Sequence, residues 1–510
     1  MRNRRIAGAL LGACLGVTAS VAAGDDAPLS AIPWLSDTLE APTERYEPPA
    51  TPLDDPAPID VAPLEPPELG TTGLISPVSV GLTGDLWAAS DTDTVTRLMR
   101  AMPGLLHPAL QTLFRNLVLA EAIPPTGSGE AFLLARVDAL LTRGDLVAAQ
   151  SLLERSGPDT PELFRRWFDI SLLLGTEDRG CATLAAKPDL VPNIETKVFC
   201  LARSGRWPTA ALTLETALAL DRITPEARDR MARFLDPELF EGEPSPPLPD
   251  PITPLDFRLL EAVGEPIPTR DLPLAFAQTD LRHIIGWKAQ IEAAERLARA
   301  GALPVQDLLA IYTARRAAAS GGVWDRVDLI QRLDVALTAG NANDVANLLP
   351  RVREAMHQVT LDAVLAALVQ PRLERLRLPA SLGPLVYEMA LLSNGRARLS
   401  APPVPPDTLP SALQDAAAVV GQDTKVRADV PLAAALAAGL EADTLPASYA
   451  DLVAQNRTGE ALLLALRDLS EGHGGDPTDA GEAVQLLTAL GLGNTARHAA
   501  AQILLLDPRG

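Results

Sequence analysis

The residue types that most often carry out chemistry are scattered along this chain. Its five histidines occur singly, and none belongs to an H-E-x-x-H sequence or to a histidine–cysteine group with zinc-ligand spacing: His107, His283, His357, His473 and His498. The sequence contains neither a phosphate-binding G-x-x-x-x-G-K-[ST] nor a G-x-S-x-G nucleophile elbow. Carboxylates are abundant, and no local sequence marks one as a glycosidase acid. We therefore expect no catalytic residue, no cofactor and no metal.

The two cysteines at positions 181 and 200 form the one pair that points to covalent chemistry. In an oxidising compartment, Cys181 and Cys200 can form a disulfide. The helical period of the sequence places Cys181 on the second helix of one predicted hairpin and Cys200 on the first helix of the next. Stacking of the hairpins would bring the two cysteines side by side. The alternative is two buried free thiols, which pack as small hydrophobes. We favour a structural disulfide, because neither cysteine belongs to a C-x-x-C redox pair.

The amino terminus has the pattern of an export signal. Three arginines precede an uncharged apolar run of about sixteen residues over 6–21, too short to span a bilayer, which needs about 20. The run ends in small residues at Val21, Ala22 and Ala23, so we expect a signal peptide over 1–23 and a periplasmic mature chain. An alternative is a lipobox ending at Cys14, which would place a lipid anchor on that cysteine.

Composition divides the rest of the chain. Residues 24–70 carry eleven acidic residues, a single arginine and eleven prolines, so they bury too little to offset the entropy of ordering. We expect a disordered, acidic, proline-rich leader over 24–80. Helices cannot run through the later proline clusters at 241–254 and 400–410. These clusters separate three regions, 90–240, 255–398 and 409–510.

Within these regions the apolar residues recur with helical period. Aromatic residues make up only 4% of the chain, and Leu and Ala dominate the apolar positions, which favours packed helices over sheets. Turn glycines at 144, 175 and 205 are separated by 31 and 30 residues. A repeat of this length predicts a stack of helical hairpins. We therefore expect an all-α protein built as an α-solenoid.

Two of these hairpins resemble degenerate tetratricopeptide repeats. The family has a small residue at the turn, a bulky residue two positions on, a small residue after five positions and a large apolar one after nine. Two sets match this spacing: Gly144, Leu146, Ala149 and Leu153, and Gly205, Trp207, Ala210 and Leu214. The usual aromatic residues early in the first helix are replaced by Leu133 and Ile194. The resemblance implies an α–α superhelix with structural, not catalytic, signature residues.

The charge of the chain restricts its partners. With 44 basic and 65 acidic residues, the formal net charge is −21, which disfavours binding to nucleic acids and to anionic lipids. We expect a non-enzymatic periplasmic scaffold or adaptor that binds a protein of the cell envelope. The acidic balance favours a cationic partner, or serves solubility alone.

Two alternative functions remain open from the sequence. The exported, Ala/Leu-rich helical layout also resembles the superhelical region of soluble lytic transglycosylases, which implies a peptidoglycan hydrolase or its accessory subunit. However, residues 413–510 lack the Glu-Ser motif of the catalytic domain of those enzymes. The same layout resembles alphaproteobacterial periplasmic motility proteins, which implies a helper of the flagellar motor.

Overall fold

The computed structural model describes residues 69–244, 246–317, 321–393, 405, 408–421 and 430–506. The chain divides into two units, Met1–Glu65 and Pro66–Gly510. All described residues belong to the second unit. The predicted signal peptide, Cys14 and residues 24–68 of the predicted leader lie outside the described residues.

The described part of the chain is all-helical, which confirms the all-α class predicted from composition. Its only β-type pairings are isolated bridges, Ile75 with Ala120 and Asp91 with Thr126. The amino-terminal helices are α2 (Thr92–Ala101), α3 (Pro108–Leu119), α4 (Gly129–Thr142), α5 (Leu146–Ser156), α6 (Pro161–Leu174), α7 (Glu177–Ala186), α8 (Ile194–Arg203), α9 (Trp207–Ala219) and α10 (Pro225–Leu235).

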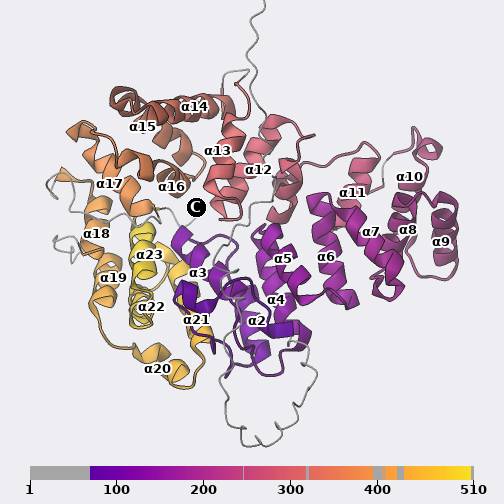
Figure 1. Ribbon diagram of the computed structural model, residues 1–510, viewed down its shortest axis with the longest axis horizontal. Coiled ribbons are helices and arrows are strands. Elements are labelled where there is room, and N and C mark those ends of the chain that lie inside the picture. The colour runs from indigo at the N-terminus through magenta and orange to yellow at the C-terminus, as the bar shows by residue number, and fades with distance from the viewer. Residues whose placement is uncertain are drawn as a thin grey trace, which may run out of the picture. The chain divides into compact units, whose positions relative to one another are not determined.

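The later helices continue to the end of the described residues (Figure 1). The middle set comprises α11 (Pro254–Ala262), α12 (Trp287–Arg299), α13 (Val305–Thr313), α14 (Val323–Ala339), α15 (Ala342–His357), α16 (Asp362–Leu373) and α17 (Gly383–Leu392). The carboxyl-terminal set comprises α18 (Ser411–Val419), α19 (Pro431–Glu441), α20 (Ala447–Ala454), α21 (Thr458–Ser470), α22 (Pro477–Ala489) and α23 (Gly493–Leu505).

Helices α4 to α10 pack in chain order, each against the next. The turns α4–α5, α6–α7 and α8–α9 contain Gly144, Gly175 and Gly205, with φ angles of 75°, 74° and 77°. This left-handed conformation is open to glycine without steric cost. The predicted turn glycines therefore lie between the two helices of each hairpin.

A disulfide and a row of aromatic rings join these hairpins. Cys181 on α7 is bonded to Cys200 on α8, with 5.0 Å between their Cα atoms, which confirms the predicted disulfide. The ring of Phe199 on α8 lies 6.3 Å from Phe168 on α6 and 5.5 Å from Phe234 on α10, centroid to centroid. Close approach of α7 to α6 depends on Gly180, since a Cβ there would lie 2.5 Å from the Phe168 ring.

Residues 69–80, which were assigned from the sequence to the end of the leader, pack against the first helices. The fully buried Arg136 on α4 holds them through hydrogen bonds to the carbonyls of Gly70 (3.1 Å) and Thr72 (2.6 Å). It also donates to the carbonyls of Val118 and Ala120. Burial lowers the pKa of Arg136 to about 10, so its charge is retained at neutral pH and is met by carbonyl dipoles.

The chain then folds back across its own first helices. Helix α11 packs against α6, and the short 3₁₀ segment Leu274–Leu281 packs against α4 and α6. The Gln278 side chain donates to the carbonyl of Gly144 (2.8 Å), and Arg258 on α11 pairs with the buried Glu177 on α7 (3.0 Å). These contacts cover part of the face that α4 and α6 present.

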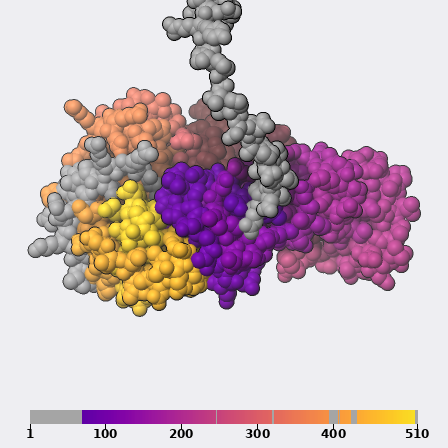
Figure 2. Space-filling model, turned by 60° about the horizontal axis from the view of Figure 1, so that its bottom comes forward, coloured from indigo at the N-terminus to yellow at the C-terminus, as the bar shows by residue number. Residues whose placement is uncertain are grey.

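The carboxyl-terminal helices lie beside the amino-terminal ones, as the adjacent indigo and yellow regions of Figure 2 show. Helix α23 packs against α3, and α21 packs against α2 and α3. The buried Gln502 on α23 accepts a hydrogen bond from the backbone N–H of Ala109 (2.8 Å) and donates to the carbonyl of Leu392 (3.3 Å). Residues almost 400 positions apart thus share one core.

Loss of the disulfide is expected to destabilise the fold. The bond closes a loop with a sequence separation of 19, and the chain-entropy model gives about 3 kcal/mol for a loop of this size. The Cys181→Ser/Cys200→Ser double variant should unfold at a lower denaturant midpoint than the oxidised wild type. Reduced wild type should behave like the variant, and identical midpoints for all three would show that the bond does not stabilise the fold.

Candidate functional site

The repeat-signature residues lie mostly in the interior. Leu146, Ala149 and Leu153 on α5 are fully buried, as is Ala210 on α9, and Leu214 is 1% exposed. Trp207 differs, because it is 46% exposed and lies 6.0 Å from the Phe234 ring, centroid to centroid. Apart from Trp207, these side chains pack the hairpins and are not available to a ligand.

The clearest binding cavity lies between the helices that begin the hairpins. A cavity of about 390 Å³, called here the first-helix cavity, is lined by residues of α6, α8 and α10 and by the segment 249–259 that leads into α11. Its volume falls within the range of ligand pockets, roughly 300–1,000 Å³. Phe168 and Met231 supply apolar lining, while three prolines of the segment line its rim: Pro249, Pro251 and Pro254.

One ion pair and one capping box hold the segment in place. Asp256, near the start of α11, accepts from Arg230 on α10 (2.9 Å). The Asp256 side chain also takes part in a capping box with Thr253, which satisfies backbone donors at the start of the helix. The charges of Arg230 and Asp256 therefore cancel within the cavity wall.

Two other carboxylates of the cavity have no such partner. Asp169 on α6 and Glu195 on α8 line it, and neither forms an ion pair within the described part of the chain. Arg165 also lines the cavity, but its nearest carboxylate is that of Glu162 (3.4 Å). Glu195 lies in the first turn of α8, where the helix dipole stabilises a negative charge. Asp169 has no comparable support.

Burial raises the pKa of Asp169 to about 6, although the nearby charges of Arg165 and Arg166 act in the opposite direction. Removing a carboxylate from water favours its neutral form unless a cation or hydrogen-bond donors replace the water. The carboxyl group of Asp169 is therefore a half-buried acid whose negative charge is incompletely compensated. Such a group attracts a cation that enters the cavity.

Asp169 was not singled out from the sequence. Apart from Ser171, it is the one polar residue in the run from Trp167 to Leu174 on α6. A carboxylate at such a position is the signal that could have identified it, because buried charges are costly without a partner.

The aromatic row was missed too. Phe168, Phe199 and Phe234 recur at intervals of 31 and 35 residues, but lie later in their helices than the aromatic residues of the family pattern.

A larger cavity, of about 710 Å³, lies beside the first hairpin, between α3, α5 and the segment before α13. Two of its charged groups form an ion pair, and a third is met by carbonyl oxygens and an aromatic ring. Arg115 pairs with Asp145 (2.6 Å), and Arg143 donates to the carbonyls of Pro103 and Ala139 while its guanidinium covers the Phe114 ring. This cavity has the size of a ligand pocket. Unmatched polar groups occur here as well, since Arg143 Nε is buried without a hydrogen-bond partner among the described residues and the exposed Asp307 also lines the cavity.

Other site classes find no support among the described residues. They contain no group of three or more His, Cys, Asp or Glu residues arranged to hold a metal ion. None of their helices combines the length and hydropathy needed to cross a membrane. Comparison of the chain with protein-family models, curated proteins and solved structures finds no match.

Neutralising Asp169 should stabilise the protein at neutral pH. The folded-state pKa of about 6 lies above the unfolded value of about 3.9, so the folded carboxyl group binds its proton more tightly. Stability is therefore lost as the pH rises from about 4 through 6. Asp169→Asn should be more stable than wild type at pH 7.5, on the order of 1–3 kcal/mol.

The difference should disappear near pH 4, where the wild-type carboxyl group is protonated in the folded state. Urea unfolding at the two pH values measures it. Asp443→Asn is the matched control, because Asp443 is exposed and forms no ion pair among the described residues. An Asp169→Asn variant that is no more stable than wild type at pH 7.5 would contradict the conclusion that burial destabilises the ionised Asp169 carboxylate.

Proposed function

We propose that this chain is an exported periplasmic scaffold that binds an extended segment of a cell-envelope protein. In this proposal, the hairpins from α4 onward form a tetratricopeptide-like superhelix, and the partner segment enters the first-helix cavity. The observation that carries the proposal is the cavity itself, because alternate helices of one continuous series, α6, α8 and α10, line it together. Helical-repeat proteins bind partners on surfaces of this kind.

The chain's own residues 249–253 support an extended ligand, because most of them line the cavity without helical structure. Pro249 and Pro251 lie in this stretch, and the helix that follows it is held by the Arg230–Asp256 ion pair. A proline-rich backbone loses little conformational entropy when it is held in an extended form. The cavity surface is therefore suited to a neighbouring extended backbone from a partner.

Charge favours a cationic side chain in that partner segment. Asp169 and Glu195 present two carboxylates without ion-pair partners to the cavity, and the whole chain carries a net charge of −21. A lysine or arginine that reaches Asp169 would supply the missing counter-charge and, as a nearby cation, would lower the pKa of its carboxyl group. Electrostatic complementarity of this kind selects partners and speeds their association.

Site-specific cross-linking tests this function in living cells. A photo-reactive amino acid in place of Glu195 should form a defined protein adduct on irradiation, whereas the same residue in place of the exposed Arg332 on α14 should not. Adding Asp169→Lys should reduce the Glu195 adduct at least about tenfold, because a like charge then faces the partner cation. Circular dichroism checks that each variant is folded.

Equal adducts at both positions, or an unchanged adduct after Asp169→Lys, would overturn the proposal.

Export is tested on the same material. The intact mass of the periplasmic protein should correspond to cleavage after Ala23 or Gly24. A protein that retains residues 1–23, or one that carries a lipid on Cys14, would contradict the export route proposed here.

A further inference from the structure

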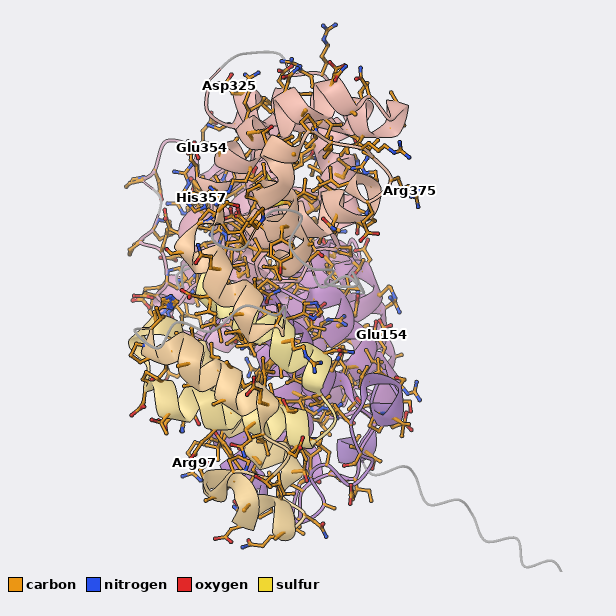
Figure 3. All side chains as sticks on the ribbon, turned by 90° about the vertical axis from the view of Figure 1, so that its left-hand side faces the viewer. Arg97, Glu154, Asp325, Glu354, His357 and Arg375 are labelled. Carbon is orange, nitrogen blue, oxygen red and sulfur yellow. A yellow bond between two sulfur atoms is a disulfide. The ribbon has the colours of Figure 1, made fainter. Side chains whose placement is uncertain are left out.

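A third cavity lies where five segments of the chain meet, far along the sequence from the first-helix cavity. It has a volume of about 70 Å³ and is called here the histidine cavity. Its lining comes from residues 105–111 at the start of α3, from Arg299 at the end of α12, from residues 357–364 between α15 and α16, from Ser470 and from residues 505–506. Figure 3 shows His357, one of its lining residues, near Glu354 on the same helix.

His107 is the most unusual group in this cavity. The side chain is only 6% exposed, yet neither ring nitrogen has a hydrogen-bond partner within the described part of the chain. Burial, and then the nearby His473, lower the pKa of His107 to about 4, so the ring is neutral at pH 7. A neutral imidazole has one N–H donor and one acceptor nitrogen. Leaving both buried and unused is costly.

Arg299 brings a positive charge that forms no ion pair in the described part of the chain, although the Glu295 carboxylate acts on it at longer range. Its Nη2 donates to the carbonyl of Val359 (2.8 Å), while its Nε is buried without a partner. Burial lowers the pKa of Arg299, but a guanidinium stays charged at neutral pH. A buried cation of this kind is stabilised by an anion close to it.

The carboxylate of Asp362, which also lines the cavity, has neighbours of its own. His357 Nδ1 lies 3.1 Å from both carboxylate oxygens of Asp362, and Arg353 lies 3.9 Å from the same carboxylate. The Ser470 hydroxyl donates to the carbonyl of Arg467 (2.6 Å), not to His357, so these residues do not form an activated nucleophile. Arg353 itself pairs more closely with Glu388 (3.0 Å), and no ion pair joins Asp362 to Arg299 among the described residues.

The loop between α15 and α16 is held in a strained conformation beside Arg299. Thr360 has a φ angle of 54°, which is rare for a β-branched residue. The Thr360 hydroxyl and Arg299 both donate to the carbonyl of Val359. Strain of this kind persists where the surrounding structure fixes a site.

We infer that the histidine cavity binds a small aliphatic monocarboxylate. The carboxylate oxygens would accept from Arg299 and from the N–H of His107, which supplies the partners that both groups lack. The apolar wall, which includes Leu106 and Val364, would contact the aliphatic part, and an inorganic anion would leave that wall unmatched. A void of about 70 Å³ holds about five water-sized groups, which is the size of propionate.

Calorimetric titration of the full chain with sodium propionate tests this inference. Wild type should bind propionate at millimolar concentration or better and should show no heat of binding with propionamide or with sodium chloride at equal ionic strength. Arg299→Met and His107→Leu should each weaken binding about tenfold or more, because each removes a hydrogen bond to a charged ligand. Arg100→Met, at an exposed arginine on α2, is the matched control and should bind as wild type does.

The affinity of folded Arg299→Met and His107→Leu decides the outcome. If circular dichroism shows that either variant is unfolded, the test is made on the wild type instead, by measuring the line broadening of ¹³C-labelled propionate. Displacement by unlabelled propionate, and not by propionamide, supports the site. Equal binding in variants and wild type, binding of propionamide, or no broadening would overturn the inference, whatever the outcome of the cross-linking at Glu195.

Discussion

The spacing between neighbouring hairpins is the constraint on which the first-helix cavity depends. The Cys181–Cys200 bond fixes α7 against α8, and Gly180, next to the bonded cysteine, lets α7 approach the Phe168 ring on α6. Because α6 carries Asp169 and α8 carries Glu195, these contacts set the distance between the two carboxylates. A larger residue at position 180 would push against Phe168, which lines the cavity. The disulfide and Gly180 therefore position the two carboxylates that we propose for binding the partner cation.

The two cavities proposed as sites share a physical feature, namely a polar group whose environment leaves it incompletely satisfied. Burial raises the pKa of the Asp169 carboxyl group, and both ring nitrogens of His107 are buried without partners among the described residues. Proteins commonly lose stability at positions that serve binding. The larger cavity beside the first hairpin shares this feature in part, since Arg143 Nε is buried there without a hydrogen-bond partner among the described residues, although Arg115 and Asp145 form an ion pair. The two proposed sites are therefore distinguished by a carboxylate or an imidazole without a partner, and not by cavity size.

Local pattern predicts local structure in this chain. The glycine spacing predicts the turns at 144, 175 and 205, and the order of the helices predicts the disulfide, since both depend on residues close in sequence. The pattern could not predict that α11 and residues 274–281 fold back over α4 and α6, because such contacts depend on which distant apolar faces meet. For the same reason, neither the missing partner of Asp169 nor the meeting of His107 with Arg299 could be read from the sequence.

The central claim is that a cation from a partner segment reaches Asp169. The most direct measurement is the pKa of the Asp169 carboxyl group, followed by ¹³C NMR, in the free protein and in the complex with the protein that cross-links at Glu195. The account predicts a value near 6 in the free protein and a clearly lower value in the complex, because a nearby cation favours the charged form. A pKa that stays the same or rises on binding would contradict it.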